Sequence, residues 1–307
     1  MSYILLLAGL FLLIKGADIF VEGAAEIAEK LRVPPLIIGL TVVSFGTSAP
    51  EAAIGISASI GGGGAISLGN VIGSNLFNLL MAIGITALAV PLTADRDVIR
   101  RDMPVNIFAT GALAVIILDG KIVWYESLLL LGALGVYLAV VIKSALKNPI
   151  TAEERRGRGW LISTIMSLGG LAAVIIGGDA VVESAKTIAA DFGMSETLIG
   201  LTVIALGTSL PEFVTSLVAA RKGEAGIAVG NAVGSCLFNI LFILGITGLF
   251  KPLTAEPELI ADVCILAFVS VAVYIFAAKG RRIGRLEGAT CVLLYAAYTA
   301  FIILRAY

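Results

Sequence analysis

The sequence GTSAPE at residues 46–51 recurs as GTSLPE at residues 207–212, and each copy lies inside a long apolar stretch. Hydrophobic residues make up 59% of the 307 positions, charged residues make up 14%, and the mean hydropathy is +1.03. This composition lies outside the range of soluble globular proteins. Because ionisable residues are costly inside a membrane, a repeated motif that carries Glu51 and Glu212 indicates a functional site.

The apolar stretches predict the fold class. A bilayer core of about 30 Å needs roughly 20 apolar residues for each spanning helix. We therefore predict an all-α integral membrane protein with ten transmembrane helices, at about 3–28, 35–59, 65–90, 103–119, 122–146, 161–190, 196–220, 225–250, 259–278 and 285–306.

Lysine and arginine residues predict the orientation. The basic clusters at residues 96–101, 155–158 and 279–285 all fall on one side of the ten-helix arrangement, and the other side keeps few positive charges. Positive charge marks the cytoplasmic side of membrane proteins. Both termini are therefore expected outside.

The chain is also an internal duplication, because 11–95 aligns with 172–256 without a gap. Residues matched by this alignment are called equivalent below. Nine of thirteen positions are identical between 39–51 and 200–212, and seven of ten between 69–78 and 230–239. Because each unit has five helices, the second must enter the membrane in the opposite sense, as in inverted-topology transporters. We expect repeats at 1–146 and 160–307, joined by a cytoplasmic linker at 147–159.

Polar residues gather on one face of the second and seventh predicted helices. In each helix a proline, Pro50 or Pro211, directly precedes the glutamate, and proline lacks an N–H and opens the helix. The carbonyls freed near Thr47 need partners, and a cation can supply one. The two faces carry Ser44, Thr47, Ser48 and Glu51, and then Ala205, Thr208, Ser209 and Glu212.

A second motif pair, GNVIGSNLFN at 69–78 and GNAVGSCLFN at 230–239, places amides and hydroxyls four residues apart on one helix face. One interpretation is that small residues let the helices pack closely. Packing does not explain a repeated proline and glutamate, so a cation site is the preferred interpretation. The polar residues that share this face are Asn70, Ser74, Asn78, Asn231, Ser235 and Asn239.

The inverted symmetry should bring Glu51 and Glu212 together near the middle of the membrane. Two carboxylates with carbonyl, amide and hydroxyl oxygens can supply the about six to eight oxygen ligands of calcium. Magnesium, which tends to keep its waters, fits less well. An empty pair of ionised carboxylates is costly, so sodium ions or protons should replace calcium when it leaves. The chain has no histidine, and its three cysteines lie at unrelated spacings, which predicts no transition-metal site and no cofactor.

Both motif pairs resemble the α-repeats of the calcium/cation antiporter superfamily, specifically the prokaryotic sodium/calcium exchanger type. The resemblance covers essentially the whole chain. It implies an antiporter in the plasma membrane of a prokaryote that works as a monomer by alternating access. It also implies a central calcium site at Glu51, Glu212, Thr47 and Thr208, with sodium sites drawing on Ser44, Ser48, Ser74, Ala205, Ser209 and Ser235, and with Asn78 and Asn239 between them.

One position departs from the resembled pattern. Some archaeal exchangers carry an aspartate where this chain has Asn239, so two acids remain instead of three, which argues against potassium cotransport. Sodium coupling is the preferred prediction and Ca²⁺/H⁺ exchange is the alternative. A cation channel is a more remote alternative, because duplicated inverted halves fit a carrier better. An intramembrane hydrolase lacks a nucleophile beside a base, so we predict no enzyme, and nothing indicates nucleic-acid binding.

Acidic stripes occupy corresponding places in the first and sixth predicted helices. Asp18 and Glu22 are equivalent to Asp179 and Glu183. They are interpreted either as the solvated ends of long tilted helices or as acidic mouths that concentrate cations, the first on the inner and the second on the outer side.

Overall fold

The computed structural model describes residues 2–61, 63–147, 158–194 and 207–306, and within them it is almost entirely helical. The first half contains α1 (Ser2–Leu31), α2 (Pro35–Ile38), η1 (Gly39–Val43), α3 (Ser44–Thr47), α4 (Ala49–Ile60), α5 (Gly64–Leu76), η2 (Phe77–Ala82), α6 (Ile83–Ala89), β1 (Leu92–Thr93), η3 (Val98–Asp102), α7 (Met103–Ile116), η4 (Ile117–Asp119), β2 (Lys121–Ile122) and α8 (Trp124–Lys147). The second contains α9 (Trp160–Asp191), α12 (Leu210–Arg221), α13 (Ala225–Phe238), η6 (Asn239–Ile243), α14 (Leu244–Phe250), β3 (Leu253–Thr254), α15 (Pro257–Ala278), β4 (Arg282–Ile283) and α16 (Arg285–Ala306).

Eight helices in the described ranges are long and apolar enough to cross a membrane. The bent pair Pro35–Thr47 and Ala49–Ile60 makes a ninth when it is taken as one span. These nine correspond to nine of the ten predicted segments, so the chain is an all-helical membrane protein. The seventh predicted segment, 196–220, lies partly outside the described residues, and α12 is its described part. The count of ten therefore stays a prediction.

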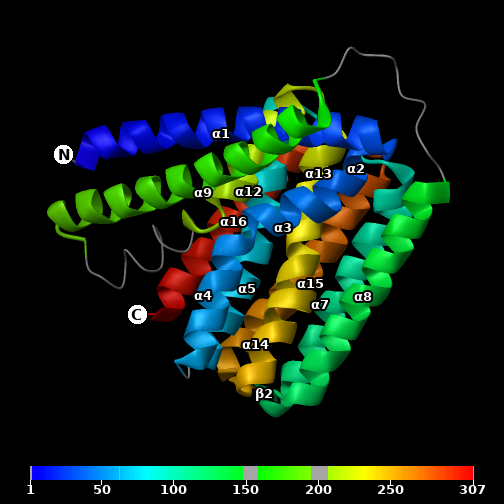
Figure 1. Ribbon diagram of the computed structural model, residues 1–307. Helices are drawn as coiled ribbons and strands as arrows, with labels where there is room; N and C mark the ends of the chain where they lie inside the picture. The colour runs from blue at the N-terminus through cyan, green and yellow to red at the C-terminus, as the bar shows by residue number, and fades with distance from the viewer. Residues whose placement is uncertain (1, 62, 148–157, 195–206, 307) are drawn as a thin grey trace.

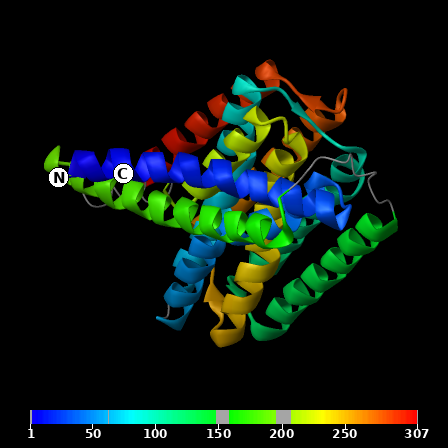
Figure 2. The ribbon, with the colours of Figure 1, turned by 45° about the horizontal axis from the view of Figure 1, so that its top comes forward.

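Helices α1 and α9 lie side by side and cross over the other helices, as both views of the ribbon show (Figure 1 and Figure 2). They run antiparallel, because Gly9 lies against Val181 and Gly23 lies against Ser167. A Cβ atom on Gly177 would come within 2.5 Å of the backbone nitrogen of Leu13. Glycines thus let the two backbones approach closely, as small residues do in membrane helix pairs.

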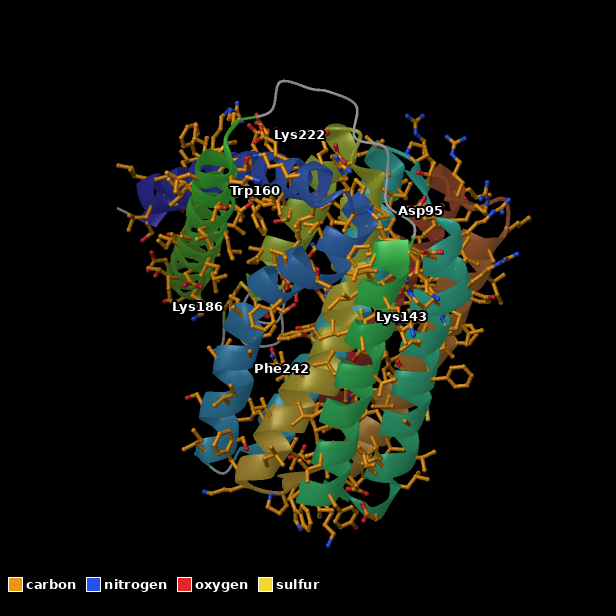
Figure 3. The ribbon with its side chains drawn as sticks, turned by 45° about the vertical axis from the view of Figure 1, so that its right-hand side comes forward. Asp95, Lys143, Trp160, Lys186, Lys222 and Phe242 are labelled. Atoms are coloured by element: carbon orange, nitrogen blue, oxygen red, sulfur yellow. The ribbon has the colours of Figure 1, made fainter. Side chains whose placement is uncertain are left out.

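Two short strand pairs connect the halves. β1 pairs with β4, and β2 pairs with β3, both antiparallel. In the alignment of the two halves, β1 is equivalent to β3, and each pairs with a strand that lies beyond the aligned residues. β2 lies at the bottom of the molecule in Figure 1, whereas Asp95, which follows β1, lies in the upper part of Figure 3. Equivalent strands therefore lie at opposite ends.

The helix breaks also recur at equivalent positions. The second span bends by 47° at Ser48, whose φ of −84° and ψ of 8° are not helical. Ser209, which precedes α12, has nearly the same conformation, with φ of −93° and ψ of 7°. In both places a proline lies in the first turn of the helix that follows, where its missing N–H does no harm. Both breaks bring the following glutamate to a helix N-terminus.

Helix α13 forms the centre of the bundle, since every residue from Ile227 to Phe238 is buried. At its end, the π-helical segment η6 begins at Asn239, and the corresponding segment η2 begins at Phe77, one residue before Asn78. Single π-helical turns are frequent at functional sites because they interrupt the regular helix. The fold thus places the two breaks and the π-helical segments η2 and η6 around one buried centre.

Candidate functional site

Glu51 and Glu212 lie in the first turns of α4 and α12, and both side chains are fully buried. Ser48 Oγ donates a hydrogen bond to Glu212 Oε1 at 2.8 Å, and Ser209 Oγ donates one to Glu51 Oε1 at 3.2 Å. Each serine therefore bonds the glutamate of the other half. Such a reciprocal exchange is what a two-fold axis between equivalent residues produces. The structure thus brings the two glutamates together at the contact between the halves.

The second oxygen of each glutamate, Oε2, is buried and has no hydrogen-bond partner. Buried polar atoms without partners are uncommon and costly in proteins. Several other predicted site residues share this property, namely Asn78 through both amide atoms, Asn239 through Oδ1, Ser235 through Oγ and Thr208 through Oγ1. These oxygens can serve as cation ligands.

The two glutamates and the hydroxyls around them offer oxygen ligands. Across the described ranges, no group of three or more histidine, cysteine, aspartate and glutamate residues is placed to hold a metal ion. Two carboxylates with neutral oxygens suit a hard cation, and softer transition metals prefer nitrogen and sulfur ligands. The site therefore fits the calcium and sodium ions predicted from the sequence.

The remaining predicted residues occupy defined positions. Ser44 Oγ donates to the carbonyl of Leu40 at 2.9 Å, and this hydroxyl packs against Gly234 of α13. Ser74 is buried in α5, close to the π-helical segment η2. Ala205 lies outside the described residues.

Asn231 contacts two predicted site residues, Thr47 and Glu212, but was not itself predicted as a site residue. Its Nδ2 donates to the backbone carbonyl of Glu212 at 3.0 Å and to Ser216 Oγ at 2.9 Å. Its Oδ1 lies 3.1 Å from Thr47 Oγ1, whose one hydroxyl hydrogen is shared with the carbonyl of Val43, also at 3.1 Å. Asn231 therefore connects α3 of the first half with α12 of the second. The signal was present in the repeated GN motif, but its partner could not be identified from spacing.

Asn75 and Cys236 are equivalent in the two halves, and the structure places them in contact. Asn75 Nδ2 donates to the carbonyl of Cys236 at 3.1 Å, and the Cys236 thiol lies 3.7 Å from the carbonyl of Asn75. Asn239 Nδ2 donates to Asn75 Oδ1 at 3.0 Å. This bond orients the Asn239 amide and leaves its Oδ1 without a partner. Asn78 has no corresponding bond, since a cysteine occupies the equivalent position.

A cavity of about 320 Å³, called the polar cavity below because charged side chains form part of its wall, lies beside the site at Thr208. Its lining includes Thr208 and the prolines Pro50 and Pro211. Asp179, Glu183 and Lys186 of α9 complete its polar wall. Lys186 Nζ lies 2.5 Å from Glu183 Oε1. Figure 3 shows Trp160 and Lys186 near the two ends of α9, with Lys222 on the side of Trp160. The cavity, which Lys186 lines, therefore lies toward the end of α9 that is farther from Lys222.

A second cavity, of about 620 Å³, is lined almost entirely by apolar side chains from α3, α8, α9 and α13. Phe242, labelled in Figure 3, stacks on Phe238 with ring centroids 4.5 Å apart at this cavity. Such a surface does not solvate an ion. The polar cavity is therefore the better candidate for an ion route.

The acidic stripe of α1 is ion-paired. Lys222 Nζ lies 2.8 Å from Asp18 and 3.4 Å from Glu22, and Arg158 lies 2.6 Å from Glu22 and 3.3 Å from Glu26. The two interpretations of the stripes therefore apply differently to the two helices. On α1 the acids pair with basic residues outside that helix, whereas on α9 Asp179 and Glu183 line a cavity and Glu183 pairs with Lys186 of the same helix.

Known proteins of similar sequence and structure are transporters. The family profile described as sodium/calcium exchanger protein matches residues 1–143 and 162–304. The sodium/calcium exchanger MaX1 of Methanosarcina acetivorans is 33% identical over 339 aligned positions, which cover 97% of both chains. The inner membrane protein YrbG of Escherichia coli is 35% identical, covering 87% of this chain and 86% of that one.

A solved structure of the sodium-calcium exchanger NCX_Mj, soaked with Na⁺ and Sr²⁺, has a similar fold. It superposes with a TM-score of 0.87 at 33% identity, covering 97% of this chain and 98% of that one. MaX1 and NCX_Mj are exchangers and not enzymes. The chain therefore belongs to the sodium/calcium exchanger protein family of membrane antiporters.

Proposed function

We propose that the chain exchanges Ca²⁺ for Na⁺ across the membrane by alternating access. The observation that carries this proposal is the reciprocal pair of buried carboxylates. Glu51 and Glu212 each accept one hydrogen bond from the other half and each keep one oxygen without a partner. Two facing carboxylates supply two negative charges, which balance one calcium ion.

The neutral oxygens around the carboxylates complete the calcium shell. Calcium takes about six to eight oxygen ligands in flexible geometry, at about 2.3–2.6 Å. The proposed central shell consists of Glu51, Glu212 and the carbonyls of Thr47 and Thr208. The proposed sodium positions flank it and draw on Ser44, Ser48, Ser74, Ala205, Ser209 and Ser235, with Asn78 and Asn239 between them. The named activities of MaX1 and NCX_Mj support this cargo.

Exchange follows from the electrostatics of the pair. When calcium leaves, two ionised carboxylates would face each other in a low-dielectric environment, which strongly disfavours the unliganded site. Sodium ions that enter as calcium leaves remove this repulsion. A conformation without bound cations is therefore disfavoured during the turnover, which couples the two ion fluxes.

The proposed topology has ten transmembrane helices in two inverted repeats, 1–146 and 160–307, with a cytoplasmic linker at 147–159. The corresponding placement of the helix breaks, the π-helical segments and the strand pairs in the two halves supports this arrangement. Both termini would lie outside a prokaryotic plasma membrane, and the functional unit would be a monomer. In this orientation the polar cavity at Thr208 opens to the outer side.

Calcium uptake into proteoliposomes tests the proposal. Vesicles that contain the purified protein are loaded with sodium and diluted into sodium-free medium with ⁴⁵Ca²⁺, and a parallel set carries an outward proton gradient at equal sodium. We expect uptake with the sodium gradient and background uptake with the proton gradient. Uptake with the proton gradient alone would instead establish Ca²⁺/H⁺ exchange, because protons can also neutralise paired glutamates. Equal uptake without either gradient would identify a channel.

A further inference from the structure

One hydrogen bond at the site lacks the counterpart that the symmetry of the two halves would predict. Thr47 is equivalent to Thr208 in the alignment of the halves, and Asn70 is equivalent to Asn231. In a symmetric site, Thr47 would bond Asn231 and Thr208 would bond Asn70. The structure contains the first bond and lacks the second.

At Thr47 the hydrogen bond between the two halves is formed, and we call this side of the site closed. Thr47 and Asn231 are fully buried, and Thr47 Oγ1 lies 3.1 Å from Asn231 Oδ1. The Asn231 amide also holds the backbone carbonyl of Glu212 at 3.0 Å. One asparagine therefore fastens the first half's broken helix to the glutamate-bearing helix of the second half.

At Thr208 the corresponding hydrogen bond is absent, and we call this side of the site open. Thr208 Oγ1 and Asn70 Nδ2 are buried atoms without a hydrogen-bond partner. Thr208 also lines the cavity of about 320 Å³ that leads away from the site. The unmade bond and the cavity thus occur at the same threonine.

We propose that Asn70 and Asn231 are positioning residues for ion exchange, which close opposite sides of the site in alternate conformations. The proposal rests on the proposed alternating access. In the described conformation, Asn231 binds Thr47 and the Thr208 side is open. In the oppositely facing conformation, Asn70 binds Thr208, and Thr47 is released from Asn231. Because one bond replaces the other, the two conformations stay close in free energy.

The partners of the two asparagines differ at one position. Asn231 Nδ2 also donates to Ser216 Oγ at 2.9 Å. The position equivalent to Ser216 is Gly55, which has no side chain that could accept a bond from Asn70. The closed Asn231 contact therefore has one hydrogen bond more than its counterpart can form. The Asn231 side chain is therefore held by one partner more than the Asn70 side chain can have.

Thr47→Val and Thr208→Val test the proposal, since each removes one hydroxyl and keeps the backbone carbonyl. KM for calcium is measured from each face of the membrane, in proteoliposomes of known protein orientation. The ratio of outer to inner KM follows the ratio of inward-facing to outward-facing protein. We expect T47V to raise this ratio about fivefold and T208V to lower it about fivefold, which corresponds to roughly 1 kcal/mol, a typical net hydrogen bond.

Thr110→Val is the matched control. Thr110 is fully buried outside the site, and its hydroxyl bonds the carbonyl four residues earlier, as that of Thr47 does. We expect T110V to leave the KM ratio unchanged. If T47V and T208V change the ratio in the same direction, or leave it unchanged, the proposed alternation is wrong. Absence of gradient-driven exchange in the unmodified protein would instead refute the proposed function.

Discussion

Replacing either buried glutamate with glutamine tests the calcium site most directly. Glu51→Gln and Glu212→Gln each keep the side-chain shape and one oxygen, and remove one negative charge. The amide oxygen can still accept the bond from Ser209 or Ser48, whose hydroxyls lie 3.2 and 2.8 Å from the present carboxylates. The substitutions therefore change the charge with little change in packing.

The expected loss is large because the charge lies in direct contact with the ion. At a calcium–oxygen distance of about 2.4 Å and an effective dielectric constant of about 20, the attraction between one carboxylate and Ca²⁺ is roughly 14 kcal/mol. Desolvation of the carboxylate offsets several kcal/mol of this, and the amide oxygen still contributes as a ligand. A net loss of about 3–5 kcal/mol, typical of removing one partner of a buried ion pair, corresponds to a loss in calcium affinity of at least about a hundredfold.

The assay is sodium-driven ⁴⁵Ca²⁺ uptake into proteoliposomes at a calcium concentration below the KM of the unmodified protein. Both variants should lose at least about 99% of the uptake rate, and to a similar degree, because the two glutamates share one site. Glu256→Gln, at an exposed loop residue before α15, is the matched control and should transport normally. A variant of Glu51 or Glu212 that folds and keeps a tenth of the rate would refute the proposed calcium shell.

Three further predictions concern the polar cavity beside Thr208, the packing of α1 against α9, and the buried ion pair of Arg101 and Asp102. Asp179→Asn should raise the KM for external calcium about two- to fivefold at low ionic strength, and the difference should disappear at high salt, because the effect of a charge in an open cavity is screened. Gly177→Ala should lower thermal stability and transport, whereas Gly169→Ala in the same helix should be tolerated, because an added Cβ meets backbone at 2.5 Å in the first case and nothing within 4 Å in the second. Arg101→Leu should destabilise the protein by about 3–5 kcal/mol in thermal unfolding, because it removes the bidentate partner of fully buried Asp102, and adding Asp102→Asn should restore most of the loss.

Much of the site could be predicted because the chain is duplicated. The alignment of the two halves identified Glu51 and Glu212 as equivalent, and the five helices predicted for each unit led to the prediction that the two copies enter the membrane in opposite senses. The prolines predicted the helix breaks, and the break at Ser48 is confirmed by its 47° bend. Local chemistry and the internal repeat were therefore enough to predict that the two glutamates lie close together.

Contacts across the two-fold axis could not be predicted. Aligning the halves shows which residues are equivalent, but not which of them lie on the axis and meet their own counterparts. Asn75 and Cys236 meet in this way, and Asn75 then orients Asn239. The pairing of Thr47 with Asn231 likewise depends on the relative placement of α3 and α13, which the sequence pattern does not contain.

The departures from symmetry carry information of their own. A perfectly symmetric antiporter would have two oppositely facing conformations of equal energy, and nothing in it would favour either. Here Asn231 has an additional bond to Ser216, whose equivalent is Gly55. The Asn239 amide is oriented by Asn75, whose equivalent is Cys236. Each of these two differences between the repeats is worth about one hydrogen bond, roughly 1 kcal/mol. A difference of this size would bias the equilibrium between the two proposed conformations without preventing exchange. Under the proposed alternating access, the repeated residues therefore make alternation possible, and the residues that differ between the repeats would determine which conformation is preferred.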